Sequence, residues 1–278
     1  YTSTVENEDQ KLLHFLQSKG LRIKEEVWSD ESVDWKQYDI AILKSPWDYF
    51  DRIHEFNDWL AAIEEHGIRL LNPLDIVRWN SDKHYLRDIA SSGLLVTPTV
   101  FIERGERPDL LEYFDTFETE RLIIKPTISG GPKNTFKFGR ADVPVLSQRI
   151  NDLLEKEGFM VQPFLAEVQD EGEWSLLFFN GKFSHCLLKK AKAGDFRVQH
   201  YLGGSIHPQL PSKELLESAE KYVKEFAQGC LYARVDGVVV RGEFHLMELE
   251  LIEPFLFLFT NEESYGNYHQ ALCEMLID

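Results

Sequence analysis

The chain has 278 residues, of which 43% are hydrophobic and 28% are charged, and its formal net charge is −17 at pH 7. This length suits one large domain or two, and the composition is that of a soluble globular protein. Nucleic acids and anionic membranes attract cationic surfaces, so we expect neither as a partner. A small polyanionic ligand stays open, because a local group of lysines with a bound metal can override the overall field.

The cysteines and the apolar runs bear on where in the cell the protein acts. Cys186, Cys230 and Cys273 lie far apart and form no C-x-x-C pair, so we expect neither a disulfide framework nor a zinc site, and we expect a cytoplasmic protein. The most apolar run, 254–259, is too short to cross a bilayer, and we identify no signal peptide. Because the first residue is Tyr, we expect the natural start, with an opening strand, to be absent.

The first 72 residues predict a small α/β domain with a parallel sheet. Asn7 and Gln10 form a capping-box pattern at the start of an apolar helical repeat. The segment 38–43 is almost wholly apolar, as in a parallel strand that is covered on both faces. The expected elements are a helix over 7–20, strands over 22–28 and 38–43, a helix over 53–67 and a strand over 68–71.

The remainder of the chain predicts an α+β arrangement with antiparallel hairpins. Asn180-Gly181 is a strong hairpin-turn dipeptide, and Gly242 marks a second turn between apolar runs. The expected elements are a helix over 82–91, strands over 99–103 and 122–126, a helix over 143–156, an apolar segment over 159–165, a hairpin over 173–190, a helix over 212–227 and a hairpin over 232–252.

Three carboxylates stand within an apolar stretch, HLMELELIEP, at 245–254. Alternation along a strand puts Glu248 and Glu250 on one face, and a hairpin could bring Asp236 opposite them. Converging carboxylates repel unless a divalent cation holds them, and oxygen ligands favour Mg²⁺ or Mn²⁺ over zinc. A solvated edge strand is the alternative. Glu253 breaks the alternation, so we expect another role for it.

Two further segments suggest anion binding. Lys125 ends an apolar strand, and the backbone amides of Gly130-Gly131 just after it could cradle phosphate oxygens, although an ordinary turn is the alternative. Four cations lie within the run 189–197, which is either an anion trap or a solvated charge run. A metal site, a phosphate clamp and a cationic loop together predict an enzyme that uses a nucleotide and a metal.

These segments resemble, in order along the chain, the ATP-grasp superfamily of carboxylate–amine ligases over about 73–260. The run 189–199 with Gly203-Gly204 is similar to a loop of ribosomal-protein glutamate ligases and bacterial glutathione synthetases, where Lys189 replaces an arginine and Gln199 an asparagine. The stretches 45–49, 77–80 and 248–254 are similar to a branch that contains the O-ureidoserine cyclo-ligase.

The resemblance implies an ATP-grasp fold of two α+β lobes, about 73–158 and 159–278, after a pre-ATP-grasp domain at 1–72. The ATP contacts it implies are Lys83, Lys125, Ser129, Gly130, Gly131, Gln162, Phe164, Leu165 and Glu173. The metal ligands it implies are Asp236, Glu248 and Glu250, which would hold two Mg²⁺ or Mn²⁺ ions. The catalytic residues it implies are Lys189 and Arg197.

The candidate substrate contacts come partly from the expected sheet and partly from the resemblance. The segment 44–49 follows a strand at the carboxyl edge of the expected sheet, where ligands of open α/β sheets bind. A structural turn is the alternative for this segment. The candidate substrate residues are Trp47, Asp48, Gln199, Gly203, Gly204 and Glu253.

The implied reaction is amide formation on a small amino-acid-like substrate. ATP would phosphorylate a carboxylate, and an amine would then displace phosphate from the acyl phosphate. A small-molecule kinase on the same scaffold is the first alternative, and a nucleotide-binding protein without catalysis is the second. The resemblance is also compatible with a homodimer.

Overall fold

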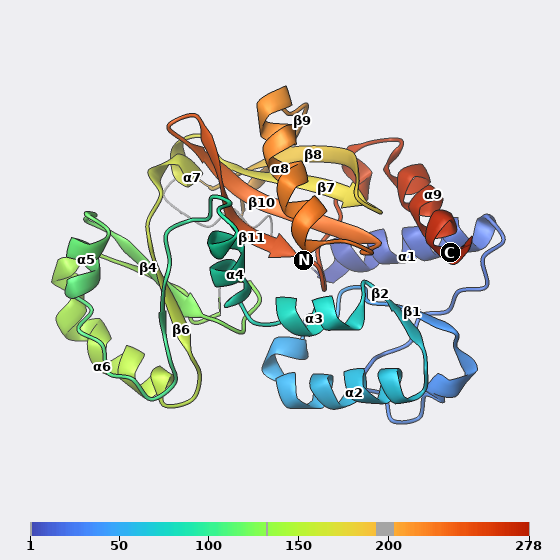
Figure 1. The fold of residues 1–278 in the computed structure, drawn as a ribbon, viewed down its shortest axis with the longest axis horizontal. Helices are drawn as coiled ribbons and strands as arrows, with labels where there is room; N and C mark the ends of the chain where they lie inside the picture. Colours follow the sequence, from blue (N-terminus) through green and yellow to red (C-terminus); the bar gives the residue numbers. More distant parts are fainter. Residues whose placement is uncertain (1, 132, 193–202, 278) are drawn as a thin grey trace.

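The computed structural model describes residues 2–131, 133–192 and 203–277, and the side chains of residues 2–6 are left out of the description. Three parts are visible in Figure 1: an N-terminal part drawn in blue, a green lobe, and a yellow-to-red lobe built on the largest sheet. The two lobes contain antiparallel sheets, and the N-terminal part contains a parallel pair. The predicted α+β fold with an α/β beginning is therefore confirmed.

The N-terminal part pairs β1 (Ile40–Ile42) with β2 (Arg69–Leu71) in parallel, and α2 (Ile53–Glu65) connects the two strands. Phe56, Leu60 and Ile63 of α2 are fully buried, which explains the apolar stripe in the sequence. The short 3₁₀ helices η1 (Trp35–Gln37) and η2 (Tyr49–Asp51) flank β1, and α3 (Leu74–Asn80) follows β2.

Two predictions for this part are wrong. The first helix, α1 (Thr2–Ser18), already includes the five residues before Asn7, so Asn7 is an interior residue and not a cap. No strand forms over 22–28, because this segment pairs with no described strand. Its Trp28 instead packs edge-on against Phe56, so side-chain packing holds the segment in place of a hydrogen-bonded ladder.

The green lobe contains a four-stranded antiparallel sheet of order β3-β6-β4-β5. Its strands are β3 (Val100–Ile102), β4 (Leu122–Pro126), β5 (Phe136–Phe138) and β6 (Phe159–Pro163), and its helices are α5 (Glu112–Thr116) and α6 (Val143–Leu154). Ile124, Phe138 and Ile150 share one buried core, so α6 covers the sheet. The helix α4 (Tyr85–Ser91) begins three residues later than predicted.

The yellow-to-red lobe contains a five-stranded antiparallel sheet of order β11-β10-β7-β8-β9. Its strands are β7 (Glu173–Phe179), β8 (Lys182–Lys190), β9 (Ser205–Gln209), β10 (Tyr232–Val240) and β11 (Glu243–Glu250), and its helices are α7 (Ala166–Asp170), α8 (Lys213–Phe226), η5 (Leu258–Thr260) and α9 (Ser264–Ile277). Both predicted hairpins are confirmed.

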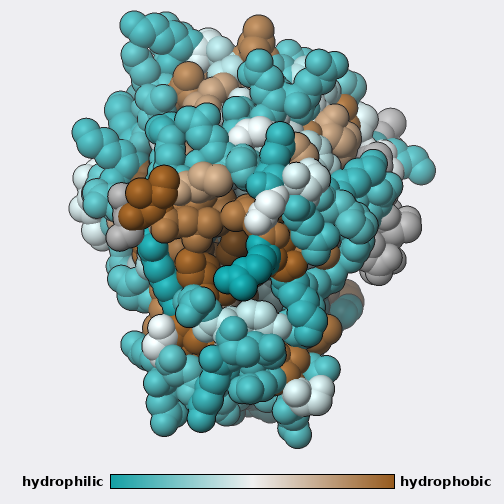
Figure 2. Space-filling view, turned by 90° about the vertical axis from the view of Figure 1, so that its right-hand side faces the viewer, coloured by the Kyte–Doolittle hydropathy of each residue, from teal (hydrophilic) through white to brown (hydrophobic). Residues whose placement is uncertain are grey.

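Alternation along β7 distributes apolar residues to two cores. Leu176 and Phe178 face α8 and α4, whereas Leu177 and Phe179 face α1 and α9. The sheet is therefore covered on both faces, as Figure 1 also shows. On the side that carries α1 and α9, hydrophilic residues surround a hydrophobic patch that lies in a hollow (Figure 2).

A β-bulge in β11 gives the acidic stretch its orientation. Asp236 pairs with Glu248 but Gly237 pairs with Leu246, so Met247 is an extra residue in the ladder. A Cβ on Gly237 would lie 2.4 Å from the carbonyl oxygen of His245, so only glycine fits here. The extra residue reverses the alternation, and Leu246 and Leu249 consequently reach the same core.

Asn72 joins the N-terminal part to the largest sheet. Its side-chain amide donates to the carbonyl oxygens of Tyr232 (2.8 Å) and Leu251 (2.7 Å), and its Oδ1 accepts from the amide of Tyr232 at 3.2 Å. The Tyr232 hydroxyl in turn donates to the carbonyl oxygen of Leu43, directly after β1. These buried bonds fix the carboxyl edge of the small parallel sheet against β10.

Candidate active site

The predicted acids lie together on neighbouring strands. Asp236 of β10 is directly opposite Glu248 of β11, and Arg234 is directly opposite Glu250. Asp236 is buried, and Glu248 and Glu250 are partly buried. Glu248 and Glu250 lie on the edge strand of this sheet, but they are partly buried and paired with Lys83 and Arg234 instead of facing only water.

Arg234, which sequence reasoning missed, is a buried cation at the centre of the acids. Its Nη2 donates to Asp236 Oδ2 at 2.8 Å and to Glu250 Oε1, and its Nη1 donates to the carbonyl oxygen of Phe255 at 3.0 Å. Ser175 also donates to Asp236, at 2.6 Å. The sequence signal for Arg234 was its position two residues before Asp236, because that spacing places both side chains on one face of a strand.

Lys189 extends this network to β7 and β8. Its ammonium lies 2.5 Å from Glu173 Oε1 and 3.1 Å from Asp236 Oδ2. Although burial opposes it, the combined attraction of Asp236 and Glu173 raises the pKa of Lys189, so this lysine is charged at neutral pH. Glu173 and Lys189, predicted as an ATP contact and a catalytic residue, therefore form a buried ion pair with each other.

Lys83 connects the acids to the predicted phosphate loop. Its ammonium donates to the carbonyl oxygen of Ser129 at 2.6 Å and lies 3.2 Å from Glu248 Oε1. Burial lowers the pKa of Lys125, and the nearby charge of Lys83 lowers it further, whereas Glu248 opposes both effects. Lys83 and Lys125, the two predicted phosphate lysines, thus both interact with Glu248.

Acids outnumber cations by one in this group, and burial opposes the ionisation of several of these acids. Five carboxylates (Glu173, Asp236, Glu248, Glu250 and Glu253) and four cations (Lys83, Lys125, Lys189 and Arg234) interact among the described residues. Burial raises the pKa of Glu250 to about 7 and that of Glu253 to about 8. Burial opposes ionisation of Asp236 as well, but Arg234 and Lys189 lower its pKa to about 2.

The donor set fits a hard divalent cation. All candidate ligands are carboxylate oxygens, and two of the acids have pKa values that a nearby positive charge would lower. Across the residues that the structure describes, however, no three acidic, histidine or cysteine side chains are grouped to enclose a metal ion. Arg234 holds Asp236 and Glu250, and Lys83 holds Glu248, so the protein cations balance part of this charge.

The predicted adenine hinge joins β6 to α7. Gln162 is buried and its side-chain amide donates to Thr99 Oγ1 at 2.9 Å. The amide of Phe164 donates to the carbonyl oxygen of Arg121 at 2.9 Å. An adenine at this hinge must therefore use backbone groups other than the amide of Phe164, and Leu165 is the neighbouring candidate.

Of the predicted substrate and catalytic residues outside the acid group, only some are brought near it. Trp47 and Glu253 are adjacent, since Trp47 Nε1 donates to the carbonyl oxygen of Glu253 at 2.9 Å, and Glu253 belongs to the acid group. Asp48 is directed elsewhere, because it accepts from Trp28 Nε1 at 2.8 Å and from Arg52. Gly203 and Gly204 precede β9, whereas Arg197 and Gln199 lie outside the described residues.

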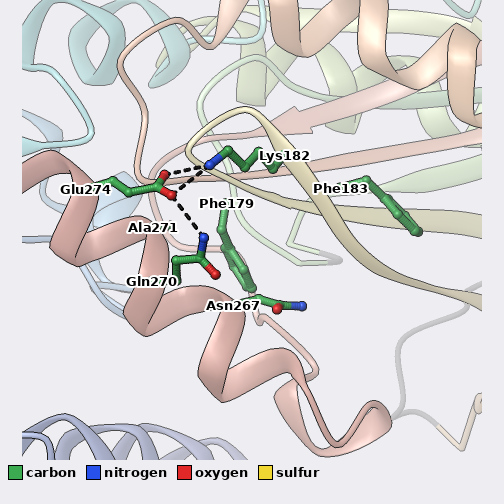
Figure 3. Close-up of a pocket in the computed structure, with 7 residues that line it drawn as sticks. All are labelled: Phe179, Lys182, Phe183, Asn267, Gln270, Ala271 and Glu274. Atoms are coloured by element: carbon green, nitrogen blue, oxygen red, sulfur yellow. Dashed lines mark hydrogen bonds and ion pairs between the residues drawn. The ribbon is translucent and has the colours of Figure 1, made fainter.

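A separate pocket lies between the β7–β8 turn and α9 (Figure 3). It is lined by Phe179, Lys182, Phe183, Asn267, Gln270, Ala271 and Glu274. Lys182 and Glu274 form an ion pair of 2.7 Å across it. Glu173 is at the opposite end of β7, so this pocket is not part of the acid group.

Two family models match the chain. The model described as "D-cycloserine synthetase DcsG, N-terminal domain" matches residues 1–72, and that described as "Prokaryotic glutathione synthetase, ATP-grasp domain" matches residues 94–255. No helix among the described residues is both long and apolar enough to cross a membrane.

Similar proteins align with most of this chain. Cycloserine biosynthesis protein DcsG of Streptomyces lavendulae is 28% identical, over 95% of this chain and 92% of its own. The crystal structure of D-cycloserine synthetase DcsG superposes with a TM-score of 0.88 at 26% identity, covering 98% of this chain and 96% of that one. D-alanine–D-alanine ligase from Bacillus anthracis shares the fold, with a TM-score of 0.62 at 15% identity over 87% of this chain and 79% of that one.

Proposed function

The chain belongs to the family of prokaryotic glutathione synthetase ATP-grasp domains, and from this premise we propose that it is an ATP- and Mg²⁺-dependent ligase that joins a carboxylate to an amine. The substrate class is a small amino-acid-like carboxylate. Three free cysteines suit a reducing cytoplasm, which is the proposed location. The N-terminal part contributes substrate contacts through the segment after β1, in particular Trp47.

One observation carries this proposal: buried Lys83 and partly buried Lys125 of one lobe meet the partly buried Glu248 of the other. Lys83 contacts Glu248, and Lys125 is close enough to the same carboxylate for each to influence the charge of the other. A site built only for stability has little use for so many desolvated charges, because the desolvation penalty can exceed the attraction. A triphosphate with its metal is a ligand that needs both signs of charge side by side.

We assign the residues to roles on this basis. Lys83 and Lys125 neutralise phosphate oxygens, and the backbone amides of 129–131 cradle them. Glu248 and Glu250, with Asp236, would hold Mg²⁺, and Arg234 fixes the orientation of Glu250 and Asp236. When bound, the metal supplies Lewis-acid stabilisation of the charge that develops on the transferring phosphoryl group.

The reaction proceeds in two displacements. A carboxylate oxygen of the substrate attacks the γ-phosphorus, and ADP leaves to give an acyl phosphate. The amine nitrogen then attacks the carbonyl carbon, the bond from that carbon to the phosphate oxygen breaks, and the nitrogen loses one proton. Buried side chains around the acid group keep water from the acyl phosphate, which would otherwise hydrolyse.

The experiment is ADP release from ATP–Mg²⁺, screened against amino acids and small peptides with and without an added amine. The proposal predicts ADP release that depends on a carboxylate substrate and yields an amide in equal amount. Hydroxylamine should trap the acyl phosphate as a hydroxamate. A stable phosphorylated product without hydroxamate would instead establish the small-molecule kinase, and no effect of ATP–Mg²⁺ on thermal stability would reject nucleotide binding altogether.

A further inference from the structure

The short helix η2 of the N-terminal part lies against the glycine-containing loop at 127–131 of the green lobe. A Cβ built on Gly130 would lie 2.3 Å from Phe50 Cε1 and 2.9 Å from Phe50 Cζ, so the ring of Phe50 packs directly on the Cα atom of Gly130. Gly130 is not among the glycines with positive φ. A side chain at this position would therefore have to displace the ring of Phe50, while the backbone conformation itself would allow one.

A second contact joins the same two segments. The ammonium of Lys133 donates to Asp51 Oδ1 and lies 6.0 Å from the centroid of the Phe50 ring. Asp51 and Lys133 are about half exposed, at 47% and 52%, so the pair alone contributes little to stability. The ion pair instead adds a second contact between the same two segments, beside the Phe50–Gly130 packing.

The base of the loop is held in a different way. The carbonyl oxygens of Thr127 and Ser129 accept from the backbone amide and the side chain of Lys83, at 2.9 Å and 2.6 Å. These bonds are internal to the ATP-grasp part. Gly130 and Lys133 instead contact η2, which belongs to another part of the chain.

The same helix also approaches the acid group. Tyr49, which precedes Phe50, is 4% exposed. Tyr49 belongs to the same buried core cluster as Ile252, the neighbour of Glu253. Burial raises the pKa of Tyr49, and the charges of Glu253 and Glu248 raise it further. Phe50 and Asp51, the next two residues of η2, contact Gly130 and Lys133.

We propose that Phe50 and Asp51 are positioning residues that hold the 129–131 loop in the conformation that binds nucleotide phosphates. The N-terminal part thereby controls triphosphate affinity, and not only substrate binding. This inference rests on the proposed function, because the loop must bind phosphate for its position to matter.

A reciprocal substitution tests the proposal, with the affinity for the non-hydrolysable analogue AMPPNP with Mg²⁺ as the measurement. Gly130→Ala places a methyl group into the Phe50 ring, and we expect affinity to fall roughly tenfold, within the coupling range of contacting residues. In the Phe50→Ala background the ring is gone, and the same Gly130→Ala change should cost less than about twofold. Phe50→Leu is the second background if Phe50→Ala does not fold.

Adenosine serves as the matched probe, because it lacks the phosphates. Its affinity should be the same in wild type, Gly130→Ala and the double variant. Charge reversal gives an independent measurement: Asp51→Lys and Lys133→Asp should each weaken AMPPNP binding, and combining them should restore part of the loss.

Failure of the positioning role and failure of the proposed function would give different results. If Gly130→Ala costs the same in both backgrounds, or weakens adenosine equally, the positioning role of Phe50 is wrong while nucleotide binding stands. If the wild-type protein binds neither AMPPNP–Mg²⁺ nor adenosine, the proposed function itself is wrong.

Discussion

Arg234 and Glu250 lie directly opposite each other in the β10–β11 hairpin, and the guanidinium donates to the carboxylate while also binding Asp236 in a fork. Arg234 is 7% exposed, so these charges have little access to water. The protein therefore carries its own cation at the point where the sequence alone suggested only a metal.

Arg234→Met should destabilise the protein and abolish turnover. The substitution removes the cation and leaves Asp236 and Glu250 buried without it, which costs about 3–5 kcal/mol. Urea unfolding measures the loss. Arg241→Asn in the exposed turn of the same hairpin is the control, because asparagine tolerates the positive φ at that position. A loss below about 1 kcal/mol would show that the acids do not depend on Arg234.

Glu248→Gln and Glu250→Gln should each raise the Mg²⁺ concentration needed for half-maximal ADP release. We expect each effect to exceed the roughly 10- to 100-fold cost of losing an outer-shell metal partner, because a direct ligand loses its charge. Titration of activity with Mg²⁺, and with Mn²⁺, checks this. Glu243→Gln, at the exposed start of β11, should leave both values unchanged. Full metal-dependent turnover in both variants would remove these acids from the metal site.

Glu8 should make stability depend on pH. Burial raises the pKa of Glu8 to about 7, against opposing effects of Lys44 and the amide of Leu258. The folded state thus binds a proton more tightly than the unfolded state, whose pKa is 4.5, so stability falls as pH rises from about 4.5 through 7.

Glu8→Gln should flatten that fall, because glutamine keeps an acceptor for the amide of Leu258 and has no charge to desolvate. Unfolding free energies at pH 5, 6, 7 and 8 provide the measurement. Glu31→Gln, at an exposed position, is the matched control. An unchanged pH profile in Glu8→Gln would show that Glu8 is not the group responsible.

Asn72→Ala should loosen the junction between the N-terminal part and β10. The change leaves backbone groups of Tyr232 and Leu251 buried without the partners they have now. The expected cost is about 2–4 kcal/mol, measured by urea unfolding, with exposed Asn57→Ala as the control. Because the junction also fixes the segment after β1, substrate affinity should weaken more than adenosine affinity; equal weakening would contradict this role.

Local patterns predicted much of the fold. Asn180-Gly181 marks the β7–β8 turn, and alternation gives Glu248 and Glu250 one face, since both signals act over a few residues. The patterns failed at 22–28, where an extended, mostly charged segment finds no described strand to pair with, and at the start of α1, where the helix continues through residues without a capping pattern. Short elements such as β5, α3 and α7 gave too few periods to detect.

For the candidate site, too, some features could be predicted from the sequence and others only from the tertiary structure. The sequence alone determined which residue types are candidates for the chemistry, because Lys125, Asp236 and the glutamates of β11 stand at recognisable places in apolar strands. Only the tertiary structure decided which charges neutralise one another: Arg234 with Glu250, Lys189 with Glu173, and Lys83 with both Glu248 and the Ser129 carbonyl. These partners lie 16 to 165 residues apart in the chain, so pairing depends on strand register and lobe packing, which no local pattern encodes.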